Sequence, residues 1–510
     1  MGFFSMVRAA QSRKLLLLVP FVFLLGLGFA LPACGQTAKS ASWVIVGAQV
    51  ADGTGKPLRQ ANVRITGDRI ARIGNFRPGK NDRVIMATGL VLAPGFIDIH
   101  NHSTSGLEKD PLAESQISQG ITAVVLGADG DSPWPIVEFL EKRRRAPAAV
   151  NLAVLVGHAT ARRKVMGDDF RRAARPEEIA AMEKLVEQGM REGAIGLSSG
   201  LEYEVGSYST TEEVVELARV AARFGGFYMT HIRDEADRSF EALREAIAIG
   251  EQARIPVEIS HIKLGTVGVW GKAKEAVRLI EEARRRGVDI TADCYPYDAW
   301  HSTITVLVPN KRYDDPASVE RGLADVGGAA NVMITECAAH KEYEFRNLEE
   351  IARARGITPV ELFIQIVKDG GAGVIGKSMI ESDIRTLYEQ PWVMVASDGG
   401  IGMRHPRAAG TYPKVLGRYV REQHWLTLPE AIRKMTSLPA RRLRWKDRGG
   451  VRKGMKADLV LFNPAIVIDR STYSDPSTLP VGIEKVFVNG ELVWDAGKPT
   501  DVRPGRVLPR

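Results

Sequence analysis

Imidazole and carboxylate side chains recur in the middle of the chain, each near the end of a short apolar segment. One such group alone is weak evidence, because a lone histidine at the end of a strand is usually structural and a lone aspartate usually caps a helix. Together the groups offer the nitrogen and oxygen ligands that zinc and other divalent first-row ions prefer. The residues concerned are His100, His102, Asp129, His231, His261 and Asp398.

The apolar segments that carry these residues are predicted to be buried parallel strands. Between Gly95 and Asp398 they alternate with helical patterns, and Pro176 followed by two glutamates is a good helix start. Eight such strands indicate an α/β fold with a (β/α)8 TIM barrel, in which the carboxyl ends of all strands meet on one face. His100 and His102 are two residues apart, so we expect them to point the same way. The predicted strands are 96–100, 123–129, 152–158, 195–200, 227–231, 257–261, 288–293 and 393–398, and the clearest helices are 176–191, 211–224, 237–253 and 272–286.

A different pattern occupies the two ends of this barrel sequence. Residues 43–93 and 451–510 contain short strands separated by turns, with apolar and polar residues alternating as in half-buried antiparallel strands. We predict a small β-sandwich domain built from both chain ends, flanking a barrel at 94–450. The barrel is expected to contain an insertion at about 298–391, because that stretch is too long for one strand–helix unit.

A competing motif, Gly196-Leu-Ser198-Ser-Gly200, has the spacing of the nucleophile elbow of serine hydrolases. That elbow requires a strand, a sharp turn and then a helix, whereas the residues after Gly200 are predicted to form a loop. A serine nucleophile would also leave the histidines at the other strand ends without a role. We therefore favour the metal site.

The first 34 residues have the pattern of an export signal. Three basic residues precede an uncharged, mostly apolar run at 15–31, which is shorter than the roughly 20 residues of a membrane-spanning helix. The run ends in Leu31-Pro-Ala-Cys34, which resembles a bacterial lipobox, in which the cysteine is lipidated. We expect an exported protein that is either periplasmic or a lipoprotein anchored through Cys34, with an uncleaved N-terminal anchor as the alternative. A lipid anchor is the only membrane contact that we predict.

The composition of the 510 residues narrows the classes of function. Apolar residues make up 45% of the chain and charged residues 25%, which is typical of a globular protein and excludes a wholly disordered one. The net charge of +8 comes partly from the basic residues of the N-terminal segment, so we expect no nucleic acid partner. Three cysteines are too few for a disulfide scaffold, and the sequence leaves open whether Cys294 and Cys337 pair.

Several longer motifs make the chain resemble the amidohydrolase superfamily and, within it, the N-acyl-D-amino-acid deacylases (D-aminoacylases). The resemblance runs from about residue 43 to residue 497, and it is specific because the motifs occur together. They are Ala93-Pro-Gly-Phe-Ile-Asp-Ile-His-Asn-His102, Ser198-Ser-Gly-Leu-Glu-Tyr203, Met229-Thr-His-Ile-Arg-Asp-Glu235, Ile259-Ser-His-Ile-Lys263, Asp293-Cys-Tyr-Pro-Tyr297, Ser397-Asp-Gly399 and His405-Pro-Arg407.

The resemblance implies a zinc centre with one or two divalent ions. In the family pattern, His231 and His261 hold a tightly bound zinc ion. His100 and His102 match the ligands of a second ion. A bridging residue lies at the end of the second strand, where well-known D-aminoacylases have a cysteine and this chain has Asp129. A carboxylate can bridge two metal ions as a thiolate can.

The resemblance also implies the reaction and the residues that act on the substrate. Asp398 matches the family's general base. Four further residues match positions that grip the substrate carboxylate or position its amide. The implied activity is metal-dependent hydrolysis of a small-molecule substrate, an N-acyl-D-amino acid, to a carboxylate and a free D-amino acid. The four substrate-binding residues are Tyr203, Lys263, Tyr295 and Arg407.

Two alternatives remain. One is a cyclic-amide or dipeptide hydrolase of the same superfamily. Many cyclic-amide relatives use a carboxylated lysine as bridging ligand, and no predicted barrel strand ends in a lysine at a ligand position. The other is a non-catalytic binding lipoprotein, which is disfavoured because all the ligand histidines and Asp398 are present.

Overall fold

The computed structural model describes residues 42–510. The predicted export signal and lipobox at residues 1–34, with Cys34, lie outside the described residues. Within residues 42–510, every helix is too short or too polar to cross a bilayer.

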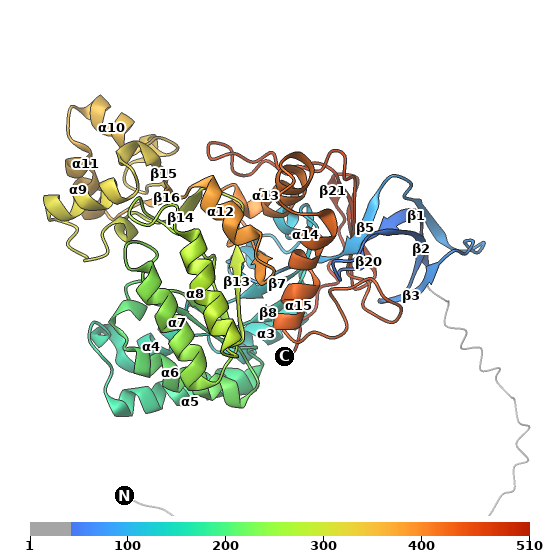
Figure 1. The fold of residues 1–510 in the computed structure, drawn as a ribbon, viewed down its shortest axis with the longest axis horizontal. Helices are drawn as coiled ribbons and strands as arrows, with labels where there is room; N and C mark the ends of the chain where they lie inside the picture. Colours follow the sequence, from blue (N-terminus) through green and yellow to red (C-terminus); the bar gives the residue numbers. More distant parts are fainter. Residues whose placement is uncertain (1–41) are drawn as a thin grey trace, which may run out of the picture. The chain divides into compact units, whose positions relative to one another are not determined.

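The predicted (β/α)8 barrel is confirmed (Figure 1), and its closure involves the predicted ligands themselves. Its strands are β6 (Phe96–Asp98), β7 (Ile121–Leu126), β8 (Asn151–Val154), β9 (Val156–Gly157), β10 (Leu197–Gly200), β11 (Tyr228–His231), β12 (Val257–Ile259), β13 (Ile290–Cys294) and β17 (Val393–Val395). The short strands β8 and β9 are two halves of one barrel strand, joined at Leu155. The last strand meets the first where the N–H of Asp398 donates to the carbonyl of His100, and the N–H of His102 donates to the carbonyl of Gly399.

Alternate residues along the barrel strands face opposite sides. Phe96, Val124 and Leu197 belong to the large core that the strands share with the surrounding helices. Their neighbours Ile97 and Val125 belong to a smaller core inside the barrel, as expected for a period of two residues. The barrel is therefore a packed core, and the polar site lies at the carboxyl ends of its strands.

The helices that the sequence predicts most clearly are present with nearly the predicted bounds. Pro176 lies in the first turn of its helix, where the missing N–H of proline costs no hydrogen bond. The barrel helices are α3 (Ile136–Arg145), α4 (His158–Met166), α5 (Pro176–Glu192), α6 (Thr211–Arg223), α7 (Ser239–Ala253), α8 (Ala273–Arg285), α12 (Glu381–Tyr388), α13 (Arg407–Lys414), α14 (Leu428–Met435) and α15 (Ser437–Arg442), with the short α1 (Gly106–Lys109) and α2 (Glu114–Ile117).

Strands from both chain ends form the small β-domain, as predicted. They are β1 (Trp43–Val50), β2 (Arg59–Thr66), β3 (Arg69–Gly74), β4 (Arg83–Met86), β5 (Val91–Pro94), β18 (Leu459–Phe462), β19 (Ile483–Val488), β20 (Glu491–Asp495) and β21 (Lys498–Pro499). Antiparallel pairing of β5 with β18 joins the two ends of the chain. Ile45, Val63, Leu459 and Phe487 share one buried core, so the sheet folds over its own apolar face.

The stretch before the last barrel strand contains an α/β unit with its own core. Its antiparallel strands β14 (Ala299–Thr303), β15 (Val332–Glu336) and β16 (Gly373–Lys377) are ordered β14-β16-β15. Helices α9 (Pro316–Asp325), α10 (Leu348–Arg355) and α11 (Pro359–Lys368) complete it. Leu362, Phe363 and Val374 are buried in the shared core, so the unit packs around its own side chains.

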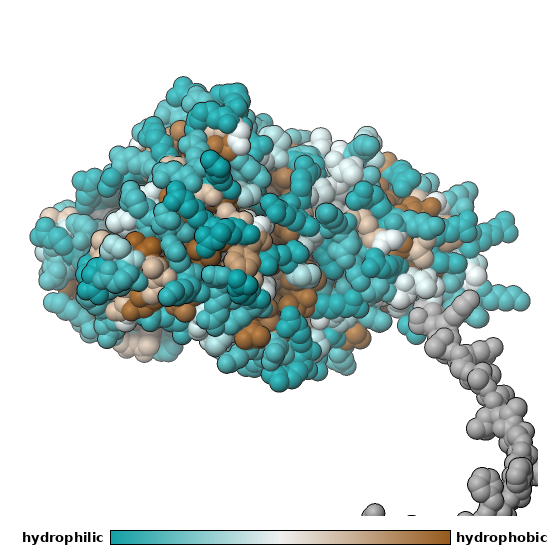
Figure 2. All heavy atoms as spheres, turned by 90° about the horizontal axis from the view of Figure 1, so that it is seen from below, coloured by the Kyte–Doolittle hydropathy of each residue, from teal (hydrophilic) through white to brown (hydrophobic). Residues whose placement is uncertain are grey.

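The surface of the described residues is mostly hydrophilic. On the face in Figure 2, apolar side chains lie in small separate patches among polar ones. Among the large apolar side chains that are most exposed, Val84 and Met86 lie together on β4, and Ile466 lies on a distant segment of the chain. This distribution is ordinary for a globular protein.

Candidate metal centre and active site

The six predicted ligand-type residues gather at the carboxyl ends of the barrel strands, and all of them except the fully buried His100 line a cavity of about 750 Å³. Most of them lie just beyond the strands rather than in them. Strand β6 ends at Asp98, before His100 and His102, and only His231 is itself a strand residue. The predicted strands were thus a few residues too long at these ends, because the chain turns as it enters the site.

His100, His102, Asp129 and Asp398 form the first half of the cluster. Nε2 of His102 lies 3.0 Å from Oδ1 of Asp398, and Nε2 of His100 lies 3.4 Å from the same oxygen. Oδ1 of Asp129 lies 3.4 Å from Nε2 of His100, and its Oδ2 lies 3.4 Å from Nε2 of His102. The four side chains whose donor atoms all lie within 4.8 Å of one another are His100, Asp129, Asp398 and His261, while His102 contacts the two carboxylates from beside this group.

His231 and His261 form the second half of the cluster. Nδ1 of His231 and Nε2 of His261 are 3.0 Å apart, and Oδ2 of Asp129 lies 3.8 Å from Nε2 of His261. Asp129 thus faces both halves of the cluster. The structure places it between the two histidine pairs, where a bridging ligand would lie.

Three of these residues adopt a backbone conformation that is unusual for a residue with a side chain. The φ angles are 55° at Asp129, 31° at His261 and 47° at Asp398. Such conformations cost about 1–3 kcal/mol each and cluster at functional sites. Hydrogen bonds compensate locally, since the N–H of His261 donates to Oδ1 of Asp293 at 2.8 Å.

The donor set fits a divalent metal ion. Both ring nitrogens of His100 and Oδ1 of Asp129 are buried and have no hydrogen-bond partner among the described residues. Buried polar atoms are normally hydrogen-bonded, so orphaned atoms here indicate a missing partner. Nitrogen and oxygen donors in this arrangement suit zinc or a similar first-row ion.

Opposite charges around the site keep its carboxylates ionised. Burial raises the pKa of Asp398, but Arg407, His100 and His261 outweigh it and hold that pKa well below the ordinary value. Burial also raises the pKa of Asp129, but the imidazoles of His100, His102 and His261 outweigh it and hold that pKa well below the ordinary value. Burial lowers the pKa of His261, and Lys263 lowers it further, yet Glu235, Asp398 and Asp129 raise it to about 9.

The two predicted substrate-binding cations line the cavity, and each is paired with a carboxylate. Nη1 of Arg407 lies 2.7 Å from Oδ2 of Asp398. Nζ of Lys263 lies 2.7 Å from both oxygens of Glu235. Tyr203 also lines the cavity, with its ring 4.4 Å from that of His231.

The predicted contact of Tyr295 with the substrate stays a prediction, and its buried hydroxyl has no hydrogen-bond partner among the described residues. The residue is buried and is absent from the cavity lining. Its ring lies 4.7 Å from the guanidinium of Arg407 and 5.7 Å from the ammonium of Lys263. Both distances are within the range of cation–π contacts.

The sequence analysis did not predict three carboxylates that lie at the site. Nε2 of His231 lies 2.7 Å from Glu202, Nδ1 of His261 lies 3.0 Å from Glu235, and Nδ1 of His100 lies 3.6 Å from Asp293. Asp293 ends a predicted strand, so the strand-end rule could have found it. Glu202 and Glu235 lie in loops, and the only signal was their place in the family motifs.

The insertion forms part of the cavity wall. Trp300, Val306, Leu307 and Val326 line the cavity together with the barrel residues. This unit is therefore part of the active-site architecture rather than a remote addition.

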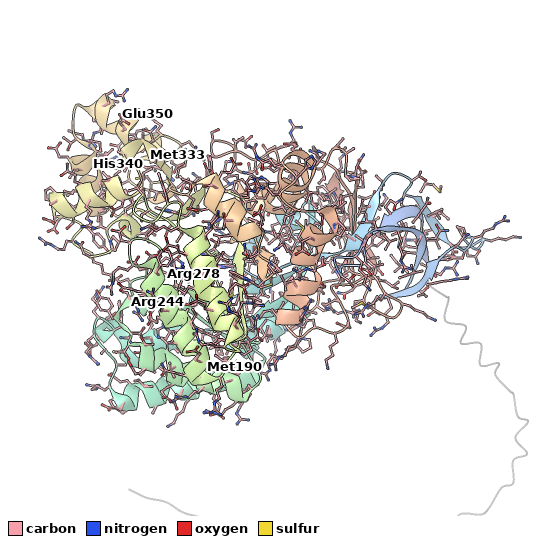
Figure 3. All side chains as sticks on the ribbon, viewed as in Figure 1. Met190, Arg244, Arg278, Met333, His340 and Glu350 are labelled. Carbon is pink, nitrogen blue, oxygen red and sulfur yellow. The ribbon has the colours of Figure 1, made fainter. Side chains whose placement is uncertain are left out.

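Other polar residues that the sequence offers have structural contacts. His158 is buried at the start of α4, with Nε2 2.8 Å from Glu213. His340 lies on the insertion (Figure 3), with Nε2 2.9 Å from Asp369, and does not line the cavity. Cys294 and Cys337 are both free and buried.

The serine-elbow motif also has a structural role. Ser198 Oγ donates to the carbonyl of Gly127 and accepts from the N–H of Gly130, so it holds the loop that carries Asp129. A turn follows β10 instead of a helix, so the nucleophile elbow is absent at this position.

Comparison with known proteins agrees with this geometry. Residues 83–494 match the model of the amidohydrolase family. A D-aminoacylase from Alcaligenes xylosoxydans xylosoxydans is 36% identical over 492 residues, which cover 92% of this chain and 97% of that protein. The chain belongs to the amidohydrolase family. The predicted family and the predicted class of enzyme, a hydrolase, are thereby confirmed.

Two solved structures are similar to this amidohydrolase along nearly their whole length. One is a D-aminoacylase with a binuclear metal centre, at 36% identity and a TM-score of 0.83, covering 92% of this chain and 99% of the other. The other is the N-acyl-D-glutamate deacylase of Bordetella bronchiseptica, complexed with zinc and a phosphonate mimic of the tetrahedral intermediate. It is 33% identical with a TM-score of 0.83, and the same shares of the two chains are covered.

Proposed function

We propose that this amidohydrolase hydrolyses the amide bond of N-acyl-D-amino acids, with zinc as its metal. The observation that carries the proposal is a single cavity lined by five of the six ligand-type side chains and by two cations, Lys263 and Arg407. The names of the similar proteins, D-aminoacylase and N-acyl-D-glutamate deacylase, support the substrate class.

The residues of the chain divide the proposed reaction between them. A divalent ion at the site supplies Lewis acidity, which activates water and polarises a carbonyl. Asp398, held ionised by Arg407, accepts the proton of the attacking water as its oxygen bonds to the carbonyl carbon. The same proton then passes to the leaving nitrogen as the C–N bond breaks. The products are a carboxylate and a free D-amino acid.

The cations give the substrate its orientation. Arg407 uses Nη1 for Asp398, and its Nε has no partner among the described residues, so the guanidinium keeps donors for a substrate carboxylate. Lys263 adds a second positive charge on the same cavity wall. A substrate carboxylate held by these two cations would fix one end of the molecule, so the D- and L-enantiomers would direct their side chains to different parts of the cavity.

The cyclic-amide alternative would need a lysine at the position of the bridging ligand, and the described residues that line the cavity offer none that is suited to it. Lys263 is the one lysine among the residues that line the cavity, and Glu235 holds its ammonium group. Such a charged lysine is unsuited to the role of a carboxylated bridging ligand, and we assign the bridging role to Asp129 instead.

Chiral product analysis tests the proposal. Zinc-loaded protein is incubated with N-acetyl-D- and N-acetyl-L-amino acids, a dipeptide and a hydantoin. We expect release of free D-amino acids, with the L-substrates and the hydantoin much slower. The variant with His231→Ala and His261→Ala is the control and should lose the activity. Faster hydrolysis of the hydantoin, or no hydrolysis of any D-substrate, would refute the proposal.

A further inference from the structure

The metal-facing histidines His231 and His261 each have a carboxylate on the far side of the ring. Nδ1 of His231 and Nε2 of His261 face each other at 3.0 Å. Their other nitrogens point away from the centre, Nε2 of His231 to Glu202 at 2.7 Å and Nδ1 of His261 to Glu235 at 3.0 Å. These two glutamates have no part in the reaction described above.

The far-side partner decides which nitrogen of a neutral imidazole binds metal. A neutral imidazole carries its proton on one nitrogen and a lone pair on the other, and only the lone pair coordinates an ion. A carboxylate accepts a hydrogen bond, so it favours the proton on the nitrogen that it faces. Glu202 and Glu235 thus favour the lone pairs on the two nitrogens that face each other.

His261 has a competing neighbour on its far side. Nζ of Lys263 lies 2.8 Å from Nδ1 of His261. An ammonium group only donates, so this contact alone would favour a lone pair on Nδ1 and the proton on Nε2, where it would block the metal. For His231, the described residues place only carboxylates on Nε2, so the competition is specific to His261.

Glu235 contacts both Lys263 and His261. Both of its oxygens lie 2.7 Å from Nζ of Lys263, and Oε1 also lies 3.0 Å from Nδ1 of His261. The side chains of Glu235, His261 and Lys263 are only 12%, 2% and 5% exposed, so water has little access to replace a lost partner.

We propose that Glu235 is a positioning residue that keeps the proton of His261 on Nδ1 against Lys263, and so reserves Nε2 for the metal ion. The inference rests on the metal centre of the proposed function. It assigns to Glu235 the control of metal affinity at His261, while Glu202 orients His231 without a competing cation.

The test is zinc affinity, measured without substrate by competition with a chelating dye. Glu235→Ala should weaken zinc binding by roughly 10- to 100-fold, as is typical for loss of an outer partner of a ligand histidine. Adding Lys263→Met to Glu235→Ala should recover most of the affinity, because the competing donor is gone. Glu235→Gln keeps an acceptor oxygen and should lose less than Glu235→Ala.

Glu202 provides the matched control. Glu202→Ala should also weaken zinc binding, but adding Lys263→Met to it should restore nothing. Wild-type affinity in Glu235→Ala, or no recovery on removing Lys263 from that variant, would overturn the proposal. Circular dichroism shows whether each variant is folded.

A spectroscopic measurement on the wild type tests the predicted tautomer of His261 even if Glu235→Ala does not fold. Nitrogen-15 spectra of the zinc-loaded protein should show the proton of His261 on Nδ1 and zinc on Nε2. The reverse assignment would overturn the proposal. Zinc binding with this dependence, in a chain that hydrolyses no N-acyl-D-amino acid, would refute the proposed function and leave this inference standing.

Discussion

At the scale of single residues, Asp398 makes three contacts that support its proposed role as the general base. One carboxylate oxygen faces His102 and His100, and the other is paired with Arg407. The positive charge around it keeps the carboxylate ionised, so it is ready to accept a proton at neutral pH. The left-handed backbone at this position, with φ of 47°, aims the side chain into the cluster.

Replacing Asp398 by asparagine keeps the size of the side chain and removes the proton acceptor. We expect the hydrolysis rate to fall by roughly 10²- to 10⁴-fold, the range typical of general acid–base groups. Steady-state kinetics and metal analysis check this, and the zinc held by His231 and His261 should largely persist. Near-normal turnover would show that another residue is the base.

The raised pKa of His261 predicts that this residue loses a proton when the metal ion binds. Because its pKa is raised to about 9, His261 in the metal-free protein is protonated at pH 7.5. Zinc needs the neutral ring, so binding at pH 7.5 should displace the proton on Nε2 of His261, together with protons from His100 and His102, whose pKa values are also raised. The His261 contribution should fall as the pH rises through 9. Calorimetry in two buffers of different ionisation enthalpy measures this release. A release that does not decline above pH 9 would contradict the assignment.

At the scale of elements, the loop after β7 shows how one strand positions a ligand on another. Gly127 and Gly130 flank the Asp129 turn with positive φ, and Ser198 on β10 is bonded to both of them. The loop is therefore fixed by its neighbour in the barrel as well as by its own sequence.

Ser198→Ala separates this structural role from that of a nucleophile. The variant leaves the carbonyl of Gly127 and the N–H of Gly130 without this partner, so unfolding free energy should fall by about 1–3 kcal/mol. Urea unfolding checks the loss, and Ser382→Ala on the exposed face of α12 is the control, with a change within about 0.5 kcal/mol. Hydrolysis should persist. Complete loss of activity in a folded Ser198→Ala protein would revive the serine-hydrolase interpretation.

The spacing of apolar residues along the chain predicted most helices and strands well. It predicted the site residues near the strand ends, but not those in loops. Helices α5 and α6 start at the predicted Pro176 and Thr211, because capping and apolar spacing are local signals. The ends of β6 and β17 were overestimated, because local periodicity continues past the point where the chain turns. Glu202 and Glu235 lie in loops, so only the folded structure shows that they reach His231 and His261.

At the scale of the whole molecule, the β-domain is attached directly to the catalytic barrel. Strand β5 pairs with β18, and β6, which leads to His100, follows after Gly95 alone. A Cβ on Gly95 would lie 2.3 Å from the side chain of Thr122, so this close junction requires glycine. The two chain ends thereby support the strand that carries the first pair of ligands.

We propose that the N-terminal segment exports the protein and anchors it through lipid on Cys34. Cys34→Ser should then release the protein from the membrane fraction, since bacterial lipoproteins carry more than one acyl chain and a single chain binds only marginally. Hydrolysis should be unchanged, because the first strand of the β-domain starts at Trp43. Fractionation and mass spectrometry check this. A soluble, unmodified N-terminus beyond Cys34 would contradict the anchor.

Zinc titration of metal-free protein tests the central claim most directly. Chelator-treated wild type is assayed on an N-acetyl-D-amino acid as zinc is added back in measured amounts. We predict no hydrolysis without metal, recovery as one or two ions bind per chain, and no recovery in the His231→Ala and His261→Ala variant. Hydrolysis at the full rate by wild type shown to be free of metal would contradict the account.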